Sequence, residues 1–238
     1  MRLSELFREV EFDGSIKNDA DINLVTDDSR LVRPGSLFVC IRHRSFDGHT
    51  AAVDALASGA AAVVTQDRLG LENELRVADS RSAYARLCAA LCNHPERKLR
   101  MIGVTGTNGK TTVTTLIRNI LSDSGTKTLL TGTVCNRLGD ENLPSGLTTP
   151  KPPELYSLLS RAVSQRCKAC VMEASSQALA QGRLEGIDFD AAVFTNITRD
   201  HLDYHGTFEN YISAKKKLFE HSALPAQGVP AGRGGCGF

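Results

Sequence analysis

The chain has 238 residues, an apolar content of 41% and a formal net charge of +1. This length allows one large domain or two of ordinary size, and the apolar content is enough for a packed core. The nearly neutral charge argues against a protein that binds nucleic acid through a basic surface. No stretch approaches the roughly 20 apolar residues that a membrane helix needs, so we also expect no membrane partner.

The N-terminus and the cysteines together predict a cytoplasmic protein. Residues 1–10 are amphipathic and too polar for a secretory signal. The chain has seven cysteines, an odd number, and shows no export signal, so we expect its thiols to be reduced. Cys167 and Cys170 have the spacing of a metal-binding pair, but no second pair accompanies them. Because Cys170 also begins an apolar strand, core packing is the better interpretation of this pair.

Residues 1–97 predict a small α/β unit. Its predicted helices cover residues 3–10, 51–59 and 81–92, and its predicted strands cover 22–26, 36–41 and 60–65. The polar segment 43–49 lies between the second strand and the second helix and predicts a loop. The polar residues 96–98 then separate this unit from the rest of the chain, so we place a domain boundary after residue 97.

Residues 98–224 predict a second unit in which strands alternate with helices. The predicted strands cover residues 99–105, 128–134, 169–173 and 191–194. The helix that ends at Gly125 carries an apolar stripe of Val113, Leu116, Ile117, Ile120 and Leu121. The helix that begins at residue 152 carries a similar stripe of Leu155, Leu158, Leu159, Ala162 and Val163. This alternation predicts a mostly parallel sheet, with ligands bound at the carboxyl ends of its strands.

Residues 100–112 have the layout of a loop that binds phosphate, because a short apolar run breaks into a glycine-rich turn and then enters a helix. Gly106 and Gly109 allow backbone amides and a helix N-terminus to approach an anion. Lys110 supplies a charge for the outer phosphates, and the hydroxyl of Thr111 can bind magnesium. The first glycine of the usual pattern would fall at Val104. The alternative is a strand-to-helix turn without a ligand, which the Gly-Lys-Thr-Thr ending disfavours.

Two later segments follow predicted strands and therefore fall at the same edge of the sheet. Glu173 ends an apolar strand, where a carboxylate can hold magnesium against nucleotide phosphates. The alternative for Glu173 is a carboxylate that caps the next helix. Residues 195–206 combine two histidines, two aspartates and one arginine. A solvated loop rarely has this content, although each of these residues alone could be unremarkable.

Lys215 lies on the apolar face of the last predicted helix, seven residues after Phe208 and four after Tyr211. An unpaired buried ammonium group is costly, so a lysine at such a position needs a partner or a chemical role. The alternative is that its stem packs against the protein while the amine reaches water. Periodicity alone leaves both interpretations open.

The motifs together resemble the Mur ligases of peptidoglycan synthesis. The resemblance rests on residues 105–112, 173–176 and 196–206, with support from residues 28–30, 46–49, 148–150 and 181–183. It runs from about residue 3 to about residue 224, and it is specific because several motifs occur in the same order across two units. It implies an α/β fold with a small N-terminal unit followed by an incomplete, P-loop-type ATPase unit.

The resemblance also implies a reaction and roles for individual residues. The implied enzyme uses ATP and Mg²⁺ to add a diamino acid, meso-diaminopimelate or L-lysine, to UDP-N-acetylmuramoyl-L-alanyl-D-glutamate through an acyl phosphate. The residues implied to bind ATP are Gly106, Thr107, Asn108, Gly109, Lys110, Thr111 and Thr112. Those implied to bind the UDP-linked substrate are Ser29, His43, Thr148, Thr149, Ser176, Gln181 and Arg183. Those implied to bind the metal are Thr111, Glu173 and His201. Those implied in catalysis are Lys110, Glu173, His201 and Lys215, the last as a carbamylated lysine.

The end of the chain departs from the family pattern. Residues 225–238 hold five glycines and two prolines without an apolar period, which predicts a disordered or out-of-frame tail. The family's C-terminal domain has no counterpart, so a truncated remnant that at most binds ATP or a UDP-sugar is the alternative function, and we expect this chain to form no tripeptide. Another P-loop ATPase or a folylpolyglutamate synthase is disfavoured by residues 28–30 and 46–49.

Overall fold

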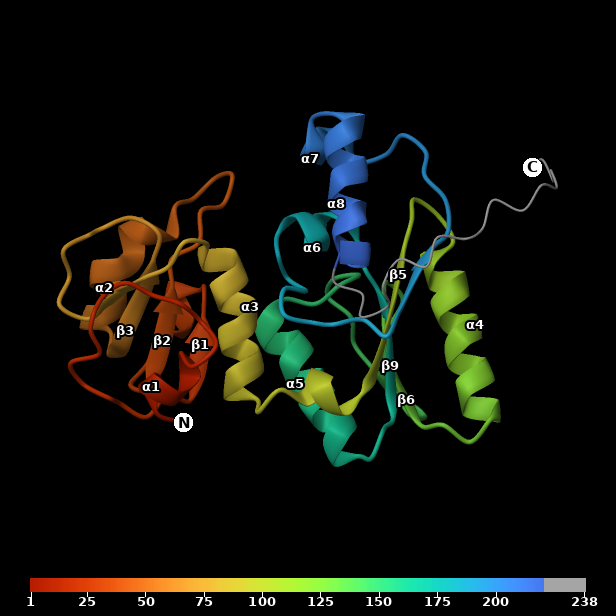
Figure 1. The fold of residues 1–238 in the computed structure, drawn as a ribbon, viewed down its shortest axis with the longest axis horizontal. Coiled ribbons are helices and arrows are strands. Elements are labelled where there is room, and N and C mark those ends of the chain that lie inside the picture. Colours follow the sequence, from red (N-terminus) through yellow and green to blue (C-terminus); the bar gives the residue numbers. More distant parts are fainter. Residues whose placement is uncertain (221–238) are drawn as a thin grey trace.

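The computed structural model describes residues 1–220, and these residues form two β-sheets with flanking helices (Figure 1). The predicted tail at residues 225–238 and the last residues of the predicted second unit lie outside the described residues. Within residues 1–220, the structure contains no helix with the length and hydropathy needed to cross a bilayer.

The first sheet is parallel throughout, with strand order β1-β2-β3-β4. Its strands are β1 Leu24–Thr26, β2 Ser36–Val39, β3 Ala60–Thr65 and β4 Glu74–Arg76. The α-helices of this region are α1 Leu3–Leu6, α2 Ala52–Ala57 and α3 Ser80–Leu91, and its 3₁₀ segments are Ser29–Leu31, Gly48–Ala51 and Pro95–Lys98. Strand β2 is buried on both faces, with Phe38 packed in the α2 cluster and Leu37 in the main core. This burial on both faces is typical of parallel strands covered by helices.

The second sheet has strand order β10-β5-β9-β6-β7-β8. Its strands are β5 Arg100–Thr105, β6 Thr128–Thr131, β7 Asn136–Leu138, β8 Glu141–Leu143, β9 Ala169–Glu173 and β10 Ala191–Phe194. Its helices are α4 Lys110–Asp123, α5 Pro152–Ser164, α6 Ser176–Ala180, α7 Leu202–His205 and α8 Phe208–Glu220. The four strands β10, β5, β9 and β6 are parallel, whereas β7 and β8 form an antiparallel extension. The predicted α/β class with a mostly parallel sheet is therefore confirmed.

The two sheets are joined by packing between α3 and α5, which lie side by side between them (Figure 1). Leu87 and Cys88 of α3 belong to the same buried cluster as Leu155 and Tyr156 of α5. The predicted boundary after residue 97 falls in the 3₁₀ segment Pro95–Lys98, directly before β5. The division into domains at this position stays a prediction.

Several local predictions need correction. The helix predicted over residues 3–10 ends at Leu6, and the strand predicted over residues 128–134 ends at Thr131. Directly after the strand, Gly132 lies against Glu173, where an added Cβ would be 2.3 Å from Oε1 of the carboxylate, and the amide of Thr133 donates to this oxygen rather than to a neighbouring strand. Strands β4, β7 and β8 were missed; each has three residues and includes charged or amide side chains that favour strands weakly.

The apolar stripe of α4 does not face the core within residues 1–220. Leu116 and Ile120 are 55% and 68% exposed, whereas Thr114 and Arg118 are the buried residues of this helix. Arg118 donates a hydrogen bond of 2.7 Å to the carbonyl of Gly139, so the buried face of α4 holds the turn between β7 and β8. The stripe of α5 faces the core as predicted, with Leu155 and its neighbours buried.

Candidate functional site

The loop between β5 and α4 has the backbone geometry that a phosphate site requires. Gly106 has φ 151° and Gly109 has φ 82°, both conformations that favour glycine. A Cβ at Gly106 would lie 1.9 Å from Oγ1 of Thr195, so no other residue fits there. Lys110 is the first residue of α4, and Thr111 and Thr112 follow in its first turn. The N-terminus of a fourteen-residue helix therefore opens into the loop.

The segment after β10 is fastened to this loop. The amide of Thr107 donates to the carbonyl of Asn196 at 2.9 Å, and the amide of Asn108 donates to Oδ1 of Asn196 at 3.0 Å. The hydroxyl of Thr195 donates to the carbonyl of Asn108 at 2.6 Å. The first two residues of the segment 195–206 therefore hold the phosphate loop in place through hydrogen bonds.

Two lysines converge on one carbonyl of the loop. Nζ of Lys110 donates to the carbonyl of Gly106 at 2.9 Å, and Nζ of Lys215 donates to the same oxygen at 2.7 Å. Lys215 is 3% exposed, and its amine lies 4.6 Å from the ring centroid of Tyr211. The amine of Lys215 is therefore buried and does not reach water, which resolves the alternatives left open by periodicity.

Burial, together with the nearby charge of Lys110, lowers the pKa of Lys215 to about 8, while the carboxylate of Asp200 opposes the shift. Burial also lowers the pKa of Lys110, against the opposing effect of the carboxylates of Glu173 and Asp200. Lys110 is therefore close enough to Lys215, Glu173 and Asp200 to be influenced by the charge of each. Asp200 did not stand out from its segment in the sequence.

Glu173 ends β9 and is 1% exposed. Its Oε1 accepts a hydrogen bond from the amide of Thr133 at 3.0 Å, and its Oε2 accepts from the hydroxyl of Thr133 at 3.0 Å. No lysine or arginine of the described residues makes an ion pair with this carboxylate. The carboxylate is thus buried and held by neutral donors, which leaves its charge available to a cation.

Thr148 and Thr149 have different environments although they are neighbours. The hydroxyl of Thr149 donates to the carbonyl of Glu173 at 2.7 Å and accepts from the amide of Ser175 at 3.0 Å, and Thr149 is 1% exposed. Thr148 is half-buried, and its Oγ1 lies 3.0 Å from the hydroxyl of Thr133. Thr149 therefore holds the backbone beyond β9, whereas Thr148 faces the edge of the site.

Ser176 is the first residue of α6, and its hydroxyl lies 3.0 Å from Nε2 of His205. His205 is 8% exposed, and burial lowers the pKa of its imidazole, which favours the neutral ring. The backbone carbonyl of His205 accepts from the side-chain amide of Asn210 at 3.0 Å. The second histidine of the residue 195–206 segment therefore orients a residue that the sequence assigned to substrate.

Gln181 and Arg183 form a further connected group. Oε1 of Gln181 accepts from Nε and NH2 of Arg183 at 2.9 and 2.7 Å, and Nε2 of Gln181 donates to the hydroxyl of Tyr204 at 3.1 Å. Arg183 also donates to the carbonyl of Thr149 at 2.7 Å. From the loop after β2, Arg44 donates to the carbonyl of Tyr204 at 2.8 Å and lies over its ring. These contacts bring the two sheets together at the site.

His43 lines a small cavity between the sheets together with Gln181 and Arg183. Its Nε2 lies 3.6 Å from the carboxylate of Asp27, and Nζ of Lys151 lies 3.3 Å from the same carboxylate. The structure thus places His43 beside residues of the second sheet that the sequence assigned to the same ligand. Ser29 begins a 3₁₀ segment after β1 and does not line this cavity.

His201 lies apart from the other predicted metal ligands. It precedes α7 with φ 50°, and its Nε2 lies 3.6 Å from the carboxylate of Asp200. Among residues 1–220, no hydrogen bond or ion pair joins His201 to Glu173 or to the phosphate loop, and no cluster of three or more His, Cys, Asp or Glu side chains could enclose a metal. Magnesium commonly binds through one or two carboxylates together with substrate phosphates, so Glu173 beside the phosphate loop fits this ion.

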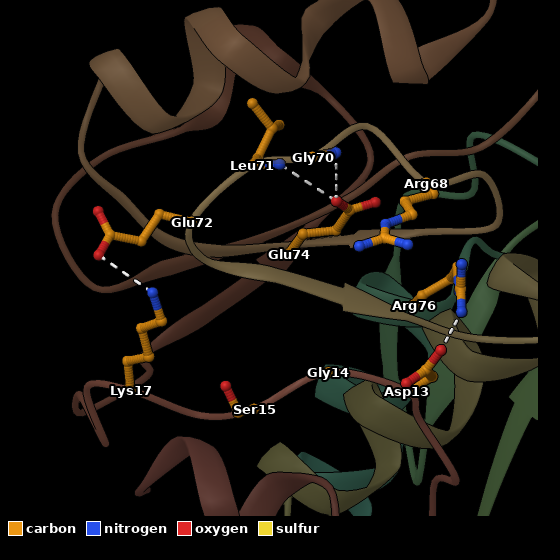
Figure 2. Close-up of a pocket in the computed structure, with 10 residues that line it drawn as sticks. All are labelled: Asp13, Gly14, Ser15, Lys17, Arg68, Gly70, Leu71, Glu72, Glu74 and Arg76. Carbon is orange, nitrogen blue, oxygen red and sulfur yellow. Dashed lines mark hydrogen bonds and ion pairs between the residues drawn. The ribbon is translucent and has the colours of Figure 1, made fainter.

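A second depression lies in the first sheet, away from the phosphate loop, and is lined by charged residues (Figure 2). Lys17 pairs with Glu72, and Arg76 pairs with Asp13. Glu74 accepts hydrogen bonds from the amides of residues 69–71. Because its acids are already paired or hydrogen-bonded, this depression is better explained as the anchoring of a loop than as a ligand site.

Comparisons with known proteins agree with this geometry. Residues 104–229 match the family model described as the Mur ligase middle domain, and residues 21–92 match the one described as Mur ligase family, catalytic domain. The chain belongs to the Mur ligase family.

Curated relatives include UDP-N-acetylmuramoyl-L-alanyl-D-glutamate–2,6-diaminopimelate ligases. The chain is 44% identical over 213 residues to the enzyme of Parabacteroides distasonis, covering 88% of this chain and 43% of that protein. It is 47% identical over 200 residues to that of Geobacillus kaustophilus, covering 84% of this chain and 41% of that protein. A solved structure of a ligase of the same name superposes with a TM-score of 0.78 and 34% identity, covering 93% of this chain and 45% of the other. The chain spans less than half the length of these relatives.

Thr133 is the main site residue that sequence reasoning missed. It follows the glycine after β6 at the same sheet edge as Glu173, and that position was the available signal. The predicted strand ran through residue 134, which would have placed Thr133 inside it. Arg44 was also missed as a link between sheets, because its contacts with residues 203 and 204 span more than 150 positions of the chain.

Proposed function

We propose that the chain functions as an ATP-dependent ligase in the cytoplasm. The reaction proposed for it is the addition of a diamino acid to UDP-N-acetylmuramoyl-L-alanyl-D-glutamate. The observation that supports this most is the meeting of the phosphate loop, Glu173 and Lys215 at one sheet edge, beside the group around Gln181 and Arg183. The names of the curated relatives favour diaminopimelate over L-lysine as the added amino acid.

In this proposal the UDP-linked substrate lies across both sheets. Its uridine end meets Ser29 and His43, and its peptide end meets Thr148, Ser176 and Arg183. The hydroxyl of Thr149 is already used within the protein, so its part in binding is to position its neighbours and to offer its carbonyl to Arg183. This path ends at the phosphate loop, where the D-glutamyl carboxylate would meet the γ-phosphate.

The reaction proceeds in two steps, phosphoryl transfer and then amide formation. The D-glutamyl carboxylate displaces ADP from the γ-phosphate of ATP and becomes an acyl phosphate. The amine of the incoming amino acid then attacks the acyl carbon, releasing phosphate and a proton as the amide forms. The amides of residues 106–112 and Lys110 hold the phosphates, and Lys110 leaves its carbonyl partners to do so. Magnesium, when bound by Glu173, Thr111 and His201, supplies additional positive charge.

Carbamylation of Lys215 belongs to the same proposal. A neutral amine is required to add carbon dioxide, and a pKa of about 8 leaves part of Lys215 neutral near neutral pH. The carbamate would replace a buried cation with an anion beside Lys110. Substitution of the matching lysine by alanine in a full-length relative should reduce turnover, and added short carboxylates should restore part of it. Unchanged turnover would contradict this role.

The test of the proposal uses the purified chain. We expect calorimetric titration to detect binding of Mg·ADP and of UDP-N-acetylmuramoyl-L-alanyl-D-glutamate, with weaker binding of UDP-N-acetylglucosamine as the control without the peptide. If the chain bound neither Mg·ADP nor the UDP-linked dipeptide, the proposal would be overturned. A parallel assay for tripeptide, with ATP and either diamino acid, separates a ligase from a chain that only binds its ligands.

A further inference from the structure

The carboxylate of Glu173 owes its position to a residue outside every motif of the sequence. The amide and the hydroxyl of Thr133 each donate to a different oxygen of the carboxylate, both at 3.0 Å. Two donors from one residue fix both the rotation and the tilt of the carboxylate plane. Each oxygen accepts one of these hydrogen bonds and keeps a second lone-pair site for a cation.

The backbone before Thr133 adapts to the same carboxylate. An added Cβ at Gly132 would lie 2.3 Å from Oε1 of Glu173, so the chain approaches the carboxylate more closely than another residue would allow. Thr133 itself is exposed, whereas Glu173 is 1% exposed. The pair therefore joins a surface side chain to a buried anion.

The hydroxyl of Thr133 has two possible acceptors but only one proton. Oε2 of Glu173 and Oγ1 of Thr148 each lie 3.0 Å from it. A carboxylate is the stronger acceptor, so the proton is donated to Glu173.

We infer that Thr133 is a positioning residue that holds Glu173 in the orientation in which it binds magnesium. This inference rests on the proposed function, because it assumes that Glu173 meets a metal beside bound nucleotide. Hydrogen bonds to a metal-binding carboxylate orient it and raise metal affinity, and their loss typically costs about 10- to 100-fold in affinity. Thr133 touches neither nucleotide nor metal in this role.

The experiment separates the hydroxyl from the amide. Thr133→Val keeps the shape and the backbone donor but removes the hydroxyl, and Thr133→Ser retains a hydroxyl. ADP binding to the full chain is titrated at a series of Mg²⁺ concentrations and again in EDTA. We expect Thr133→Val to raise, by about 10- to 100-fold, the Mg²⁺ concentration that produces half of the increase in ADP affinity. The affinity for ADP in EDTA should be unchanged. Thr133→Ser should recover most of the loss.

Two further variants test whether Thr133 influences Mg²⁺ affinity through the carboxylate of Glu173. On a Glu173→Gln background, Thr133→Val should cause no additional loss of Mg²⁺ affinity, because the residue acts through the carboxylate. Thr126→Val, the same change at the opposite edge of the second sheet, should leave Mg²⁺ affinity unchanged. Thermal unfolding of each variant checks that the fold is retained.

The outcomes distinguish the inference from the proposed function. If the wild-type chain shows magnesium-dependent ADP binding and Thr133→Val matches it, the inference is overturned and the proposed function stands. An equal loss with Thr133→Val and Thr133→Ser, or a loss that also occurs in EDTA, would likewise overturn the positioning role. A wild-type chain without magnesium-dependent ADP binding would overturn both.

Discussion

Lys215 is the residue whose environment departs most from its ordinary chemistry. Its amine is buried, donates to the carbonyl of Gly106 and lies against the ring of Tyr211. The folded state therefore binds the proton of this amine less tightly than the unfolded state, with a pKa of about 8 against an ordinary 10.5. Below pH 8 the protonated amine carries its full desolvation cost, and the cost disappears as pH rises toward 10.5.

The corresponding prediction concerns the free energy of unfolding as a function of pH. Relative to Lys215→Met, the wild-type chain should gain up to about 1.4 kcal/mol of stability per pH unit between pH 8 and pH 10.5. Below pH 8 the difference between the two proteins should be flat. The measurement is denaturant unfolding in buffers free of carbon dioxide, so that the amine stays unmodified. Parallel pH profiles for the two proteins would show that Lys215 is not the group responsible.

At the scale of elements, α4 and α5 show how the same pattern can have two outcomes. Both helices carry an apolar stripe, yet Ile120 of α4 is 68% exposed and Leu159 of α5 is fully buried. The difference arises because α4 uses Arg118 and Thr114 to contact the sheet and the β7–β8 turn. Helical periodicity identifies an apolar face, but which face meets the sheet depends on the neighbouring elements.

This difference predicts unequal effects of substitution in the chain. Ile120→Gln should change the free energy of unfolding by less than about 0.5 kcal/mol, since the side chain is already in water. Leu159→Ala should cost about 2 to 5 kcal/mol, because it leaves a cavity in the core shared by the two sheets. Urea unfolding measures both values. Similar losses for the two variants would mean that the α4 stripe is covered in solution.

Helix α7 is a single turn, and two of its carbonyls accept hydrogen bonds from the loop after β2. Arg44 donates to the carbonyls of Asp203 and Tyr204 at 3.1 and 2.8 Å, where a cation also favours the helix dipole. So short a helix is not stable without such contacts. The same turn carries His205, which orients Ser176.

We therefore expect Arg44→Ala to loosen α7 more than the molecule as a whole. Amide hydrogen exchange at His205 and Gly206 should speed up several-fold, because a contact of this kind is worth up to about 1 kcal/mol. Arg30→Ala is the matched control, because Arg30 is an exposed arginine of the 3₁₀ segment after β1 and pairs locally with Asp28. Equal exchange in both variants would contradict the capping role.

At the scale of the whole molecule, the sequence could predict what is encoded in contiguous stretches. The glycine-rich turn between strand and helix, the edge position of Glu173 and the parallel sheet each depend on local pattern and are confirmed as structural features. The pattern placed Lys215 on the apolar face of its helix but left open whether its amine is buried, which the structure shows. The contacts of Thr133 with Glu173 and of Arg44 with Tyr204 could not be predicted, because they join residues 40 and 160 positions apart. His201 was assigned to the metal site by resemblance, and its place there stays a prediction.

The two sheets also share a buried charged group that only the tertiary structure reveals. The carboxylate of Asp27 accepts from the hydroxyl of Tyr84 at 3.1 Å and from Lys151 of the second unit at 3.3 Å. This contact lies beside His43 and the Gln181–Arg183 group. The proposed substrate path therefore crosses the place where the two sheets meet, so substrate binding and the arrangement of the sheets depend on the same residues.

In the proposed function, one chain holds separate but adjacent sites for nucleotide and for the UDP-linked dipeptide. Calorimetric titration of the wild-type chain, Lys110→Ala and Arg183→Ala with each ligand tests this directly. We predict that Lys110→Ala loses at least about tenfold in Mg·ADP affinity, the equivalent of about 1.4 kcal/mol, and keeps dipeptide binding. Arg183→Ala should lose affinity for the UDP-linked dipeptide and keep its affinity for Mg·ADP. Loss of both ligands in both variants, or of neither, would contradict this arrangement of two separate sites.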